Sequence, residues 1–448
     1  MLMPLWTDMA FFILMLGGLY LGWRSSKREH LRRPWKRVFK DTVGVVSLTV
    51  LLVFILIGLL DSIRFQQVTN TQSSQQDVIS LLDVVLTPMR TQVEKTYSAP
   101  FSHTAYAKEM GVDKEGVAKR IYPRLKYGAA HLNNPVTDKF ADILKKLMAG
   151  TGFSLLVWLG LMFILWGFNK RSFKFVQSKG TKSFLFTLLG VLMIVGAIAS
   201  LSPFYHVLGT DKVGEDVLYQ AIKSIRTGLV IGSLTTIVML PIAISLGLMA
   251  GFFRGWVDDI IQYLYTTLSS IPGVLLIAAA ILMAQVYMAN NPELFTTVED
   301  RADMRLLLLC IILGITSWTG LCRLLRAETL KIREMDYVLA ARALGVGPIK
   351  ILKRHVLPNV MHLVMITIAL DFSGLVLAEA VLSYINIGVD PSTYSWGNMI
   401  NTSRLEMARE PIVWWSLLAA FSFMFVLVLA ANLFADSVRD AFDPRSNT

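Results

Sequence analysis

The sequence DYVLAARALGVGPIKILKRHVLPN, Asp336–Asn359, lies between two apolar runs, Arg305–Leu325 and Val360–Gly388. Each run is long enough to cross a bilayer core of ~30 Å. Helix formers dominate the first half of the stretch, and Gly345 stands where a left-handed helix terminator would fall, because glycine tolerates positive φ. Pro348 then suits the first position of a second helix, where a missing N–H costs no hydrogen bond. The pattern predicts two short helices joined by a sharp turn between two membrane spans.

The predicted helix pair is suited to docking another protein, because it is held outside the membrane and its first helix carries small residues. That helix, Met335–Leu344, contains Ala340, Ala341 and Ala343, which add almost no side-chain bulk. We expect Ala341 to lie on the face that enters the partner, and Pro358 to close the second helix before the next apolar run. A structural loop with helical pieces is the alternative interpretation.

The composition is that of a membrane protein. Of 448 residues, 54% are hydrophobic and 17% are charged, whereas ordinary globular domains are about 25% charged. The formal charge of +11 comes from Lys and Arg clustered in short loops between apolar runs. This clustering is the pattern of the positive-inside rule and argues against nucleic-acid binding. Cys310 and Cys322 lie ~18 Å apart along one helix, so we expect two free thiols and no disulfide.

Nine apolar runs are predicted to cross the membrane. The first is preceded by no Lys or Arg and is followed by RSSKREHLRRPWKR, which predicts an uncleaved span with its N-terminus outside. Nine crossings then place both the C-terminus and Asp336–Asn359 inside, where Lys350, Lys353 and Arg354 agree with the assignment. The runs are Trp6–Trp23, Val43–Leu60, Thr151–Phe168, Phe184–Leu201, Ser224–Gly251, Ile260–Ala289, Arg305–Leu325, Val360–Gly388 and Ile412–Ala435.

The runs divide the chain into four predicted segments. Residues 1–60 hold two spans and a basic cytoplasmic loop. Residues 61–150 are rich in Gln, Ser, Thr and scattered charges, with no span-length apolar run, and are interpreted as an extracytoplasmic domain. Residues 151–182 hold a third span and the basic loop NKRSFKFVQSKGTK, and residues 183–448 hold six spans. Within the extracytoplasmic domain we expect helix at Asp77–Leu86 and Val136–Met148.

Several motifs resemble one family of membrane proteins. Leu339-Ala340-Ala341, Gly345 and Leu357-Pro358 fall at the spacing of the EAA loop of bacterial ABC-importer permeases. Leu339 replaces the usual glutamate there, which removes a charge at the contact. The ending HVLPN resembles the dipeptide/oligopeptide branch. Four further stretches resemble that branch, namely Gly209–Val217 (GTDKVGEDV, with Glu215 where Arg is usual), Gly255–Asp258 (GWVD), Leu377–Met399 (LAEAVLSYINIGVDPSTYSWGNM, with Tyr384 and Asn386 departing) and Arg439–Arg445 (RDAFDPR).

The resemblance covers Gly180–Arg445 and implies the C-type permease subunit of a dipeptide/oligopeptide ABC importer, preceded by an N-terminal extension. It implies an all-α polytopic membrane protein with a six-span core in the bacterial cytoplasmic (inner) membrane. Expected partners are a second, B-type permease, two ABC ATPase subunits and an extracytoplasmic substrate-binding protein, with peptide as substrate. Import of nickel, glutathione or opines is one alternative, and a non-transporting membrane assembly factor or sensor is another. The ATPase-coupling loop would comprise Asp336, Leu339, Ala340, Ala341, Gly345, Gly347, Pro348, Leu357 and Pro358.

No residue pattern supports an enzyme. The six histidines form no ligand cluster with Cys or carboxylates, so no metal or cofactor is expected, and without a Walker loop ATP hydrolysis must come from partner subunits. Asp371 and Glu379 are the acids well inside the eighth span; they either line or gate a polar path, or hydrogen-bond within the helix bundle. Pro241 and Pro272 interrupt helical hydrogen bonding in the fifth and sixth spans. Kinks there suit an alternating-access transporter, and irregular packing is the other interpretation.

Overall fold

The predicted membrane part of the chain is mainly helical among the described residues. The computed structural model describes residues 5–27, 29–66, 78–112, 118–167, 179–294 and 297–442. Within these ranges, eight helical segments are long and apolar enough to cross a membrane, and Trp6–Tyr20 is a shorter apolar helix. The predicted all-α polytopic class is confirmed. The predictions for Asp77, Phe168, residues 169–178 of the second basic loop and residues 443–445 concern residues outside the described ranges.

The chain forms two compact units. The first unit comprises Phe39–Thr227 and Tyr394–Ala430, together with the first four residues. Its helices include α3 (Thr42–Ser62), α6 (Pro135–Gly167), α8 (Lys179–Leu201) and α17 (Trp396–Glu406). The second unit comprises Leu5–Val38, Gly228–Thr393 and Ala431–Thr448. Two long helices, α9 (Val217–Phe253) and α18 (Trp415–Phe442), contribute residues to both units.

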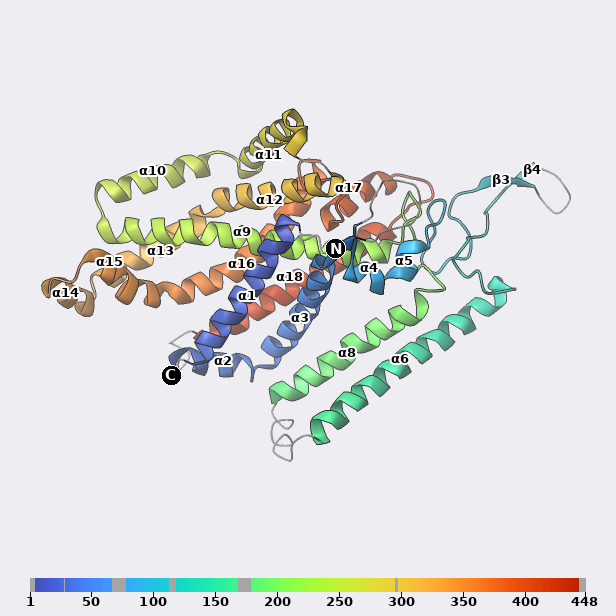
Figure 1. Ribbon diagram of the computed structural model, residues 1–448, viewed down its shortest axis with the longest axis horizontal. Helices are drawn as coiled ribbons and strands as arrows, with labels where there is room; N and C mark the ends of the chain where they lie inside the picture. Colours follow the sequence, from blue (N-terminus) through green and yellow to red (C-terminus); the bar gives the residue numbers. More distant parts are fainter. Residues whose placement is uncertain are drawn as a thin grey trace. The chain divides into compact units, whose positions relative to one another are not determined.

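In the first unit, α6 and α8 pack side by side along much of their length (Figure 1). Small residues form this contact: a Cβ on Gly150 would collide with the Gly196 carbonyl, and a Cβ on Gly196 would collide with Ser154. Small residues let helix backbones approach closely, which is how helices associate in lipid. Helix α3 also packs against α8. Two spans from the N-terminal segment therefore contact the first span of the predicted core.

The segment between α3 and α6 is not simply helical. Strands β1 (Arg64–Gln66) and β2 (Val78–Ser80) pair antiparallel, as do β3 (Glu109–Val112) and β4 (Ala118–Ile121). Two one-turn helices, α4 (Leu81–Val85) and α5 (Thr87–Thr91), lie between the hairpins.

The predicted helix at Asp77–Leu86 is wrong for Val78–Ser80, which forms the strand β2. Helix α4 begins only at Leu81 because Ser80 and Asp83 form a capping box there, each side chain accepting a hydrogen bond from the other residue's backbone N–H. The predicted helix at Val136–Met148 is confirmed. It forms the first part of α6, which continues past residue 150, the predicted end of the extracytoplasmic domain, to Gly167.

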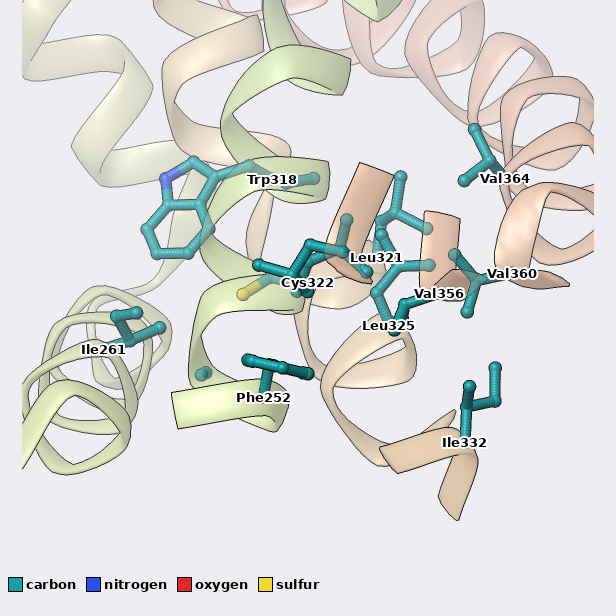
Figure 2. Packing of buried hydrophobic residues seen from close by; sticks show 14 of the residues in the cluster. Phe252, Ile261, Trp318, Leu321, Cys322, Leu325, Ile332, Val356, Val360 and Val364 are labelled. Carbon is teal, nitrogen blue, oxygen red and sulfur yellow. The ribbon is translucent and has the colours of Figure 1, made fainter. Parts of the chain in front are cut away.

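The second unit has a buried apolar core built by α9, α10 (Trp256–Ser270), α13 (Thr319–Arg333) and α16 (Leu357–Tyr384). Figure 2 shows its centre, where Leu321, Cys322 and Leu325 of α13 lie close to Val356 and Val360. Cys310 and Cys322 are both buried and free, as the sequence predicts. This core fixes the ends of α13 and α16 relative to each other.

The run Ile260–Ala289, predicted as one span, is two helices, and only the second is by itself long and apolar enough to cross a membrane. Helix α10 ends at Ser270 and α11 (Gly273–Asn290) begins after Pro272, which caps it. The residue before a proline is pushed out of the helical region, and Ile271 accordingly has φ −87° and ψ 131°. Pro272 thus ends one helix and starts another, whereas Pro241 lies inside α9, which is assigned as one helix from Val217 to Phe253.

Helix α1 (Trp6–Ser26) packs against α12 (Val298–Ser317) near their N-terminal ends. The backbone N–H of Thr7 donates to Asp303 Oδ2 at 3.0 Å, and the Thr7 hydroxyl also donates to this carboxylate. Helix α2 (Glu29–Val38) packs through Val38 against the last turns of α18. These contacts place α1 and α2 in the second unit.

Candidate functional site

The helix pair predicted from Asp336–Asn359 is present. Helix α14 (Asp336–Ala343) ends in a Schellman motif: the Val346 N–H bonds the Ala341 carbonyl at 3.0 Å and the Gly345 N–H bonds the Arg342 carbonyl at 2.9 Å. Gly345 has φ +74°, the left-handed conformation that favours glycine. Helix α15 (Pro348–Ile351) then starts with Pro348 in its first turn. The two helices and their turn follow from local sequence rules.

The face of α14 that carries Ala341 is buried against the protein's own core and is not exposed to a partner as predicted. Ala341 is only 8% exposed and packs with Val338 in the apolar core, so the expectation that Ala341 faces a partner is wrong. Three residues apart, these two side chains share one helix face, and that face rests on α13. The outward face instead presents Leu339, which is 43% exposed, and Leu344, which is 83% exposed.

The second helix does not end at Pro358, as the sequence suggested. Helical structure runs on from Pro348 through a π turn, η2 (Leu352–Val356), into α16. Proline lacks an N–H and its ring crowds the carbonyl four residues earlier. The π turn just before it, where the Leu357 N–H reaches back to the Leu352 carbonyl, is the wider geometry that accommodates such a defect.

The helix pair rests on the adjoining ends of α9, α10 and α13, here called the stem, and specific contacts hold these ends together. Arg326 of α13 forms two hydrogen bonds with the Asp258 carboxylate of α10, at 2.6 and 2.7 Å. Arg333, at the end of α13, donates to the Phe252 carbonyl at 2.7 Å. Arg342 of α14 stacks over the Phe252 ring, 4.8 Å from its centroid. The pair therefore lies on a fixed base at one end of α13 and α16 (Figure 1).

The exposed surface of the pair is apolar at its tip and basic beside it. Leu344 and Ile349, 64% exposed, project from the turn region. A recess of about 660 Å³ is lined by Ile349 together with Lys350, Lys353 and Arg354. The remaining members of the predicted loop at this surface are exposed: Asp336, Ala340, Gly345, Gly347 and Pro348. Exposed apolar side chains beside positive charge are features of a protein-docking surface.

The two acids of α16 have different surroundings. Glu379 is 3% exposed, and its carboxylate accepts a hydrogen bond from the Ser383 hydroxyl at 2.7 Å. Asp371 is half-buried, and among the described residues its carboxylate has no hydrogen-bond or ion-pair partner. Two turns of α16 separate them, so one acid is hydrogen-bonded and the other has no hydrogen-bond or ion-pair partner among the described residues.

Two motif stretches gain a physical explanation. In Leu377–Met399, Asn386 stands at the end of α16 with φ +63°, a conformation that Gly and Asn tolerate best. In Gly209–Val217, Gly214 has φ +85° and Asp216 caps α9, accepting from the N–H groups of Leu218 and Tyr219.

A buried cluster of charges joins the N-terminal segment to α9. Lys223 of α9 donates to Asp83 at 2.8 Å and lies 2.9 Å from Asp61 at the end of α3. Asp83 also accepts from the Tyr219 hydroxyl at 2.7 Å, and Asp61 accepts from Ser80 at 2.8 Å. All the charges in the cluster are partnered. The ammonium group ties two N-terminal elements to the start of α9.

A second buried cluster surrounds His206. Its Nδ1 lies 2.9 Å from Asp216, and its Nε2 lies 3.6 Å from Glu94 as an ion pair. Burial disfavours the imidazolium, but these two carboxylates outweigh it and raise the pKa of His206 to about 9. Burial also opposes ionisation of Glu94. The contact with His206 and the N–H groups of residues 126–128 prevail and lower the pKa of Glu94 to about 2. His206 is therefore charged and Glu94 is ionised at neutral pH.

Comparisons with known proteins show the family. The family model described as binding-protein-dependent transport system inner membrane component matches residues 243–448. The oligopeptide transport system permease protein OppC of Mycobacterium tuberculosis is 29% identical over 243 residues, which are 54% of this chain and 77% of that protein. The glutathione transport system permease protein GsiD of Pectobacterium atrosepticum is 31% identical over 242 residues, 54% of this chain and 73% of that protein. The chain belongs to this permease family.

A further relative is the dipeptide transport system permease protein DppC of Lactococcus lactis, 31% identical over 242 residues, which are 54% of this permease and 64% of that protein. The family match at residues 243–448 includes the α14–α15 pair and both acids of α16. The described helices α1 to α6 and α8 precede that match. The 448-residue permease carries an N-terminal extension.

Sequence reasoning missed the charge clusters of the permease. Asp216 had one readable signal, since it stands just before a helix and suits an N-cap. Lys223 and Asp83 are 140 positions apart, and no periodicity links them. His206 and Glu94 are likewise joined only by the folded chain.

Proposed function

We propose that this ABC-importer permease translocates peptides across the bacterial cytoplasmic membrane, driven by ATP hydrolysis in partner subunits. The observation that carries the proposal is the α14–α15 pair: an exposed apolar tip on a fixed stem between two helices long enough to span a membrane. Such a pair transmits force only if another protein holds its tip. The relatives named as oligopeptide and dipeptide permeases favour peptide as the substrate.

The proposed complex contains a second, B-type permease, two ABC ATPase subunits and an extracytoplasmic substrate-binding protein. Closure of the ATPases on ATP would move α14, and α13 and α16 would carry that movement into the spans. The loop residues Leu357 and Pro358 lie at the start of α16 and not at the tip, so their part would be to connect the tip to the span.

Purification of the full chain in mild detergent tests this proposal. We expect two ATPase chains and a second permease to co-purify, and ATP hydrolysis by the complex to rise when a loaded substrate-binding protein is added. Recovery of the chain without an ATPase would favour a membrane assembly factor or sensor and would refute the transport proposal.

Glutathione is the second candidate substrate, because one relative is named a glutathione transport permease. Uptake into proteoliposomes separates the two. Under the peptide proposal, unlabelled dialanine competes with a labelled dipeptide and glutathione does not. The reverse order of competition would assign the chain to glutathione; nickel and opines can be compared in the same assay.

We further propose that the N-terminus lies outside, the C-terminus lies in the cytoplasm, and residues 61–150 form the extracytoplasmic part between the spans of residues 1–60 and 151–182. Ser102→Cys should then react with an impermeant thiol reagent in intact cells, after entry to the periplasm in a Gram-negative host. Lys350→Cys should react only after lysis. The unmodified chain is the control, since Cys310 and Cys322 are buried. Labelling of both sites from one side would contradict this orientation.

Asp371 is proposed to line the path and Glu379 to hold the helix bundle. Asp371→Asn should lower transport several-fold while the amount of assembled complex stays unchanged, because the carboxylate has no protein partner to lose among the described residues. Glu379→Ala leaves the Ser383 hydroxyl without its acceptor, at a cost of ~1–3 kcal/mol, so complex yield should fall together with transport. Quantitative blotting and uptake measure both. A loss of yield with Asp371→Asn would assign that acid to packing.

A further inference from the structure

A recess of about 440 Å³ lies away from the coupling surface, where the C-terminal end of α11 meets the start of α12 and the loop after α16. Its polar lining comes from Gln285, Arg301, Arg305 and Asp390, and Met288 contributes an apolar wall. The volume falls in the range of small-molecule sites, about 300–1,000 Å³. It is large enough for an amino acid or a dipeptide and too small for a folded protein segment.

The recess contains hydrogen-bond donors that have no acceptor among the described residues. Arg305 is engaged: its Nε donates to the Gly388 carbonyl at 3.1 Å and its Nη1 lies 3.5 Å from the Asp390 carboxylate. Arg301, one turn earlier on α12, is exposed at the recess, and its guanidinium has no partner among the described residues. The Gln285 Nε2 atom is buried and also has no hydrogen-bond partner there. Open donors therefore line the cavity from two helices.

The charge of the recess is positive by one unit, with two guanidinium groups against the single carboxylate of Asp390. Like charges four residues apart on a helix repel each other, so an added negative charge is favourable here. Asp300, the nearest acid along α12 to Arg301, already accepts from the Thr297 hydroxyl at 2.8 Å. A guanidinium presents a planar fork of N–H groups that matches the two oxygens of a carboxylate or phosphate.

We propose that this recess binds the oxyanion of a small molecule, a carboxylate or a phosphate monoanion, between Arg301 and Gln285. Arg305 and Asp390 hold the wall in place, and Met288 contacts the apolar part of the ligand. The oxyanion accepts from both open donors and neutralises the excess charge. Two sources carry this chemistry: the C-terminal carboxylate of a soluble peptide-like ligand, and the phosphate of an anionic lipid. The proposal depends on neither the direction of transport nor the identity of the ATPase.

Binding to the full chain in phosphatidylcholine nanodiscs tests the site. Isothermal titration with dialanine and with its C-terminal amide reports whether a carboxylate is required, and native mass spectrometry after exchange into phosphatidylglycerol reports lipid retention. We expect one probe, dialanine or phosphatidylglycerol, to bind at least tenfold more tightly than its match, the amide or phosphatidylcholine. Preference for dialanine identifies a soluble ligand, and preference for phosphatidylglycerol identifies a lipid.

Two variants locate the binding. Arg301→Gln removes the open guanidinium, and the nearly isosteric Gln285→Glu replaces the amide donor by a carboxylate that repels the ligand oxyanion beside it. Each should weaken binding at least tenfold. Arg120→Gln is the matched control, because Arg120 is an exposed arginine on β4, outside the recess, and should bind as the unmodified chain does. Equal size-exclusion profiles establish that the variants are folded. Binding that is unchanged in both recess variants, or absent for every probe, overturns the proposal.

Discussion

Replacing Leu344 by glutamate should abolish co-purification of the ATPase subunits while the chain still inserts into the membrane. Leu344 is 83% exposed at the end of α14 and packs against little of its own chain, so the change should not disturb the fold. At the proposed contact, however, the new carboxylate must be buried without a partner, which costs several kcal/mol. The measurement is the ratio of ATPase to permease after affinity purification, together with substrate-stimulated ATP hydrolysis.

Two controls isolate the contact. Leu344→Met keeps the apolar surface and should behave as the unmodified chain, and Phe39→Glu introduces the same charge at another exposed apolar residue. At the turn, Gly345→Val forces a branched residue to φ +74° at a cost of ~1 kcal/mol or more, whereas Gly345→Asn tolerates that conformation. The valine variant should couple more weakly than the asparagine variant. Full ATPase binding by Leu344→Glu would exclude α14 as the coupling element.

Lys223→Met should destabilise the protein by ~3–5 kcal/mol, because it leaves two buried carboxylates without their counter-ion. Thermal unfolding in detergent, followed by tryptophan fluorescence, measures the loss. The matched control is Lys95→Met: Lys95 pairs with Glu109 at 2.7 Å, but its side chain is 79% exposed, so the change should cost ~0–1 kcal/mol.

A compensating variant makes the second test specific. Adding Asp61→Asn and Asp83→Asn to Lys223→Met removes the uncompensated negative charge and should restore part of the stability. If the triple variant is no more stable than Lys223→Met alone, the loss comes from packing of the lysine chain and not from the buried carboxylates. Equal melting of Lys223→Met and Lys95→Met would show that the cluster contributes no more than a surface pair.

Local rules explain why the helix pair was predictable. Gly345 ends α14 in a left-handed residue, and Pro348 begins α15, so both boundaries depend on residues within a few positions of each other. Most apolar runs were equally readable as helices, since hydropathy needs no tertiary information, but hydropathy did not reveal the break at Pro272 within Ile260–Ala289. The same kind of local reasoning predicted that the cysteines are free, because twelve residues of a continuous helix would separate them too far for a bridge; the structure places them on the successive helices α12 and α13.

The failures share a different cause. Ala341 has the size expected of a docking residue, but which side of α14 turns inward is decided by packing on α13. Proline is compatible with the start of a helix as well as with its end. At Pro358 the preceding π turn lets the helical segment continue into α16. The Lys223 cluster depends on elements 140 residues apart. Side-chain pairing across such separations has no signature in a single sequence.

The unbroken helical segment from Pro348 to Tyr384 makes the coupling region a lever. Its 37 residues correspond to a rod ~55 Å long at 1.5 Å per residue. A tilt of ~5° about its midpoint would move each end by ~2.4 Å. A small rotation imposed at α15 would therefore reach the far end of α16 with no hinge to absorb it. The π turn η2 lies within this rod. There the backbone hydrogen bond spans five residues instead of four, so one extra residue is accommodated in the helix.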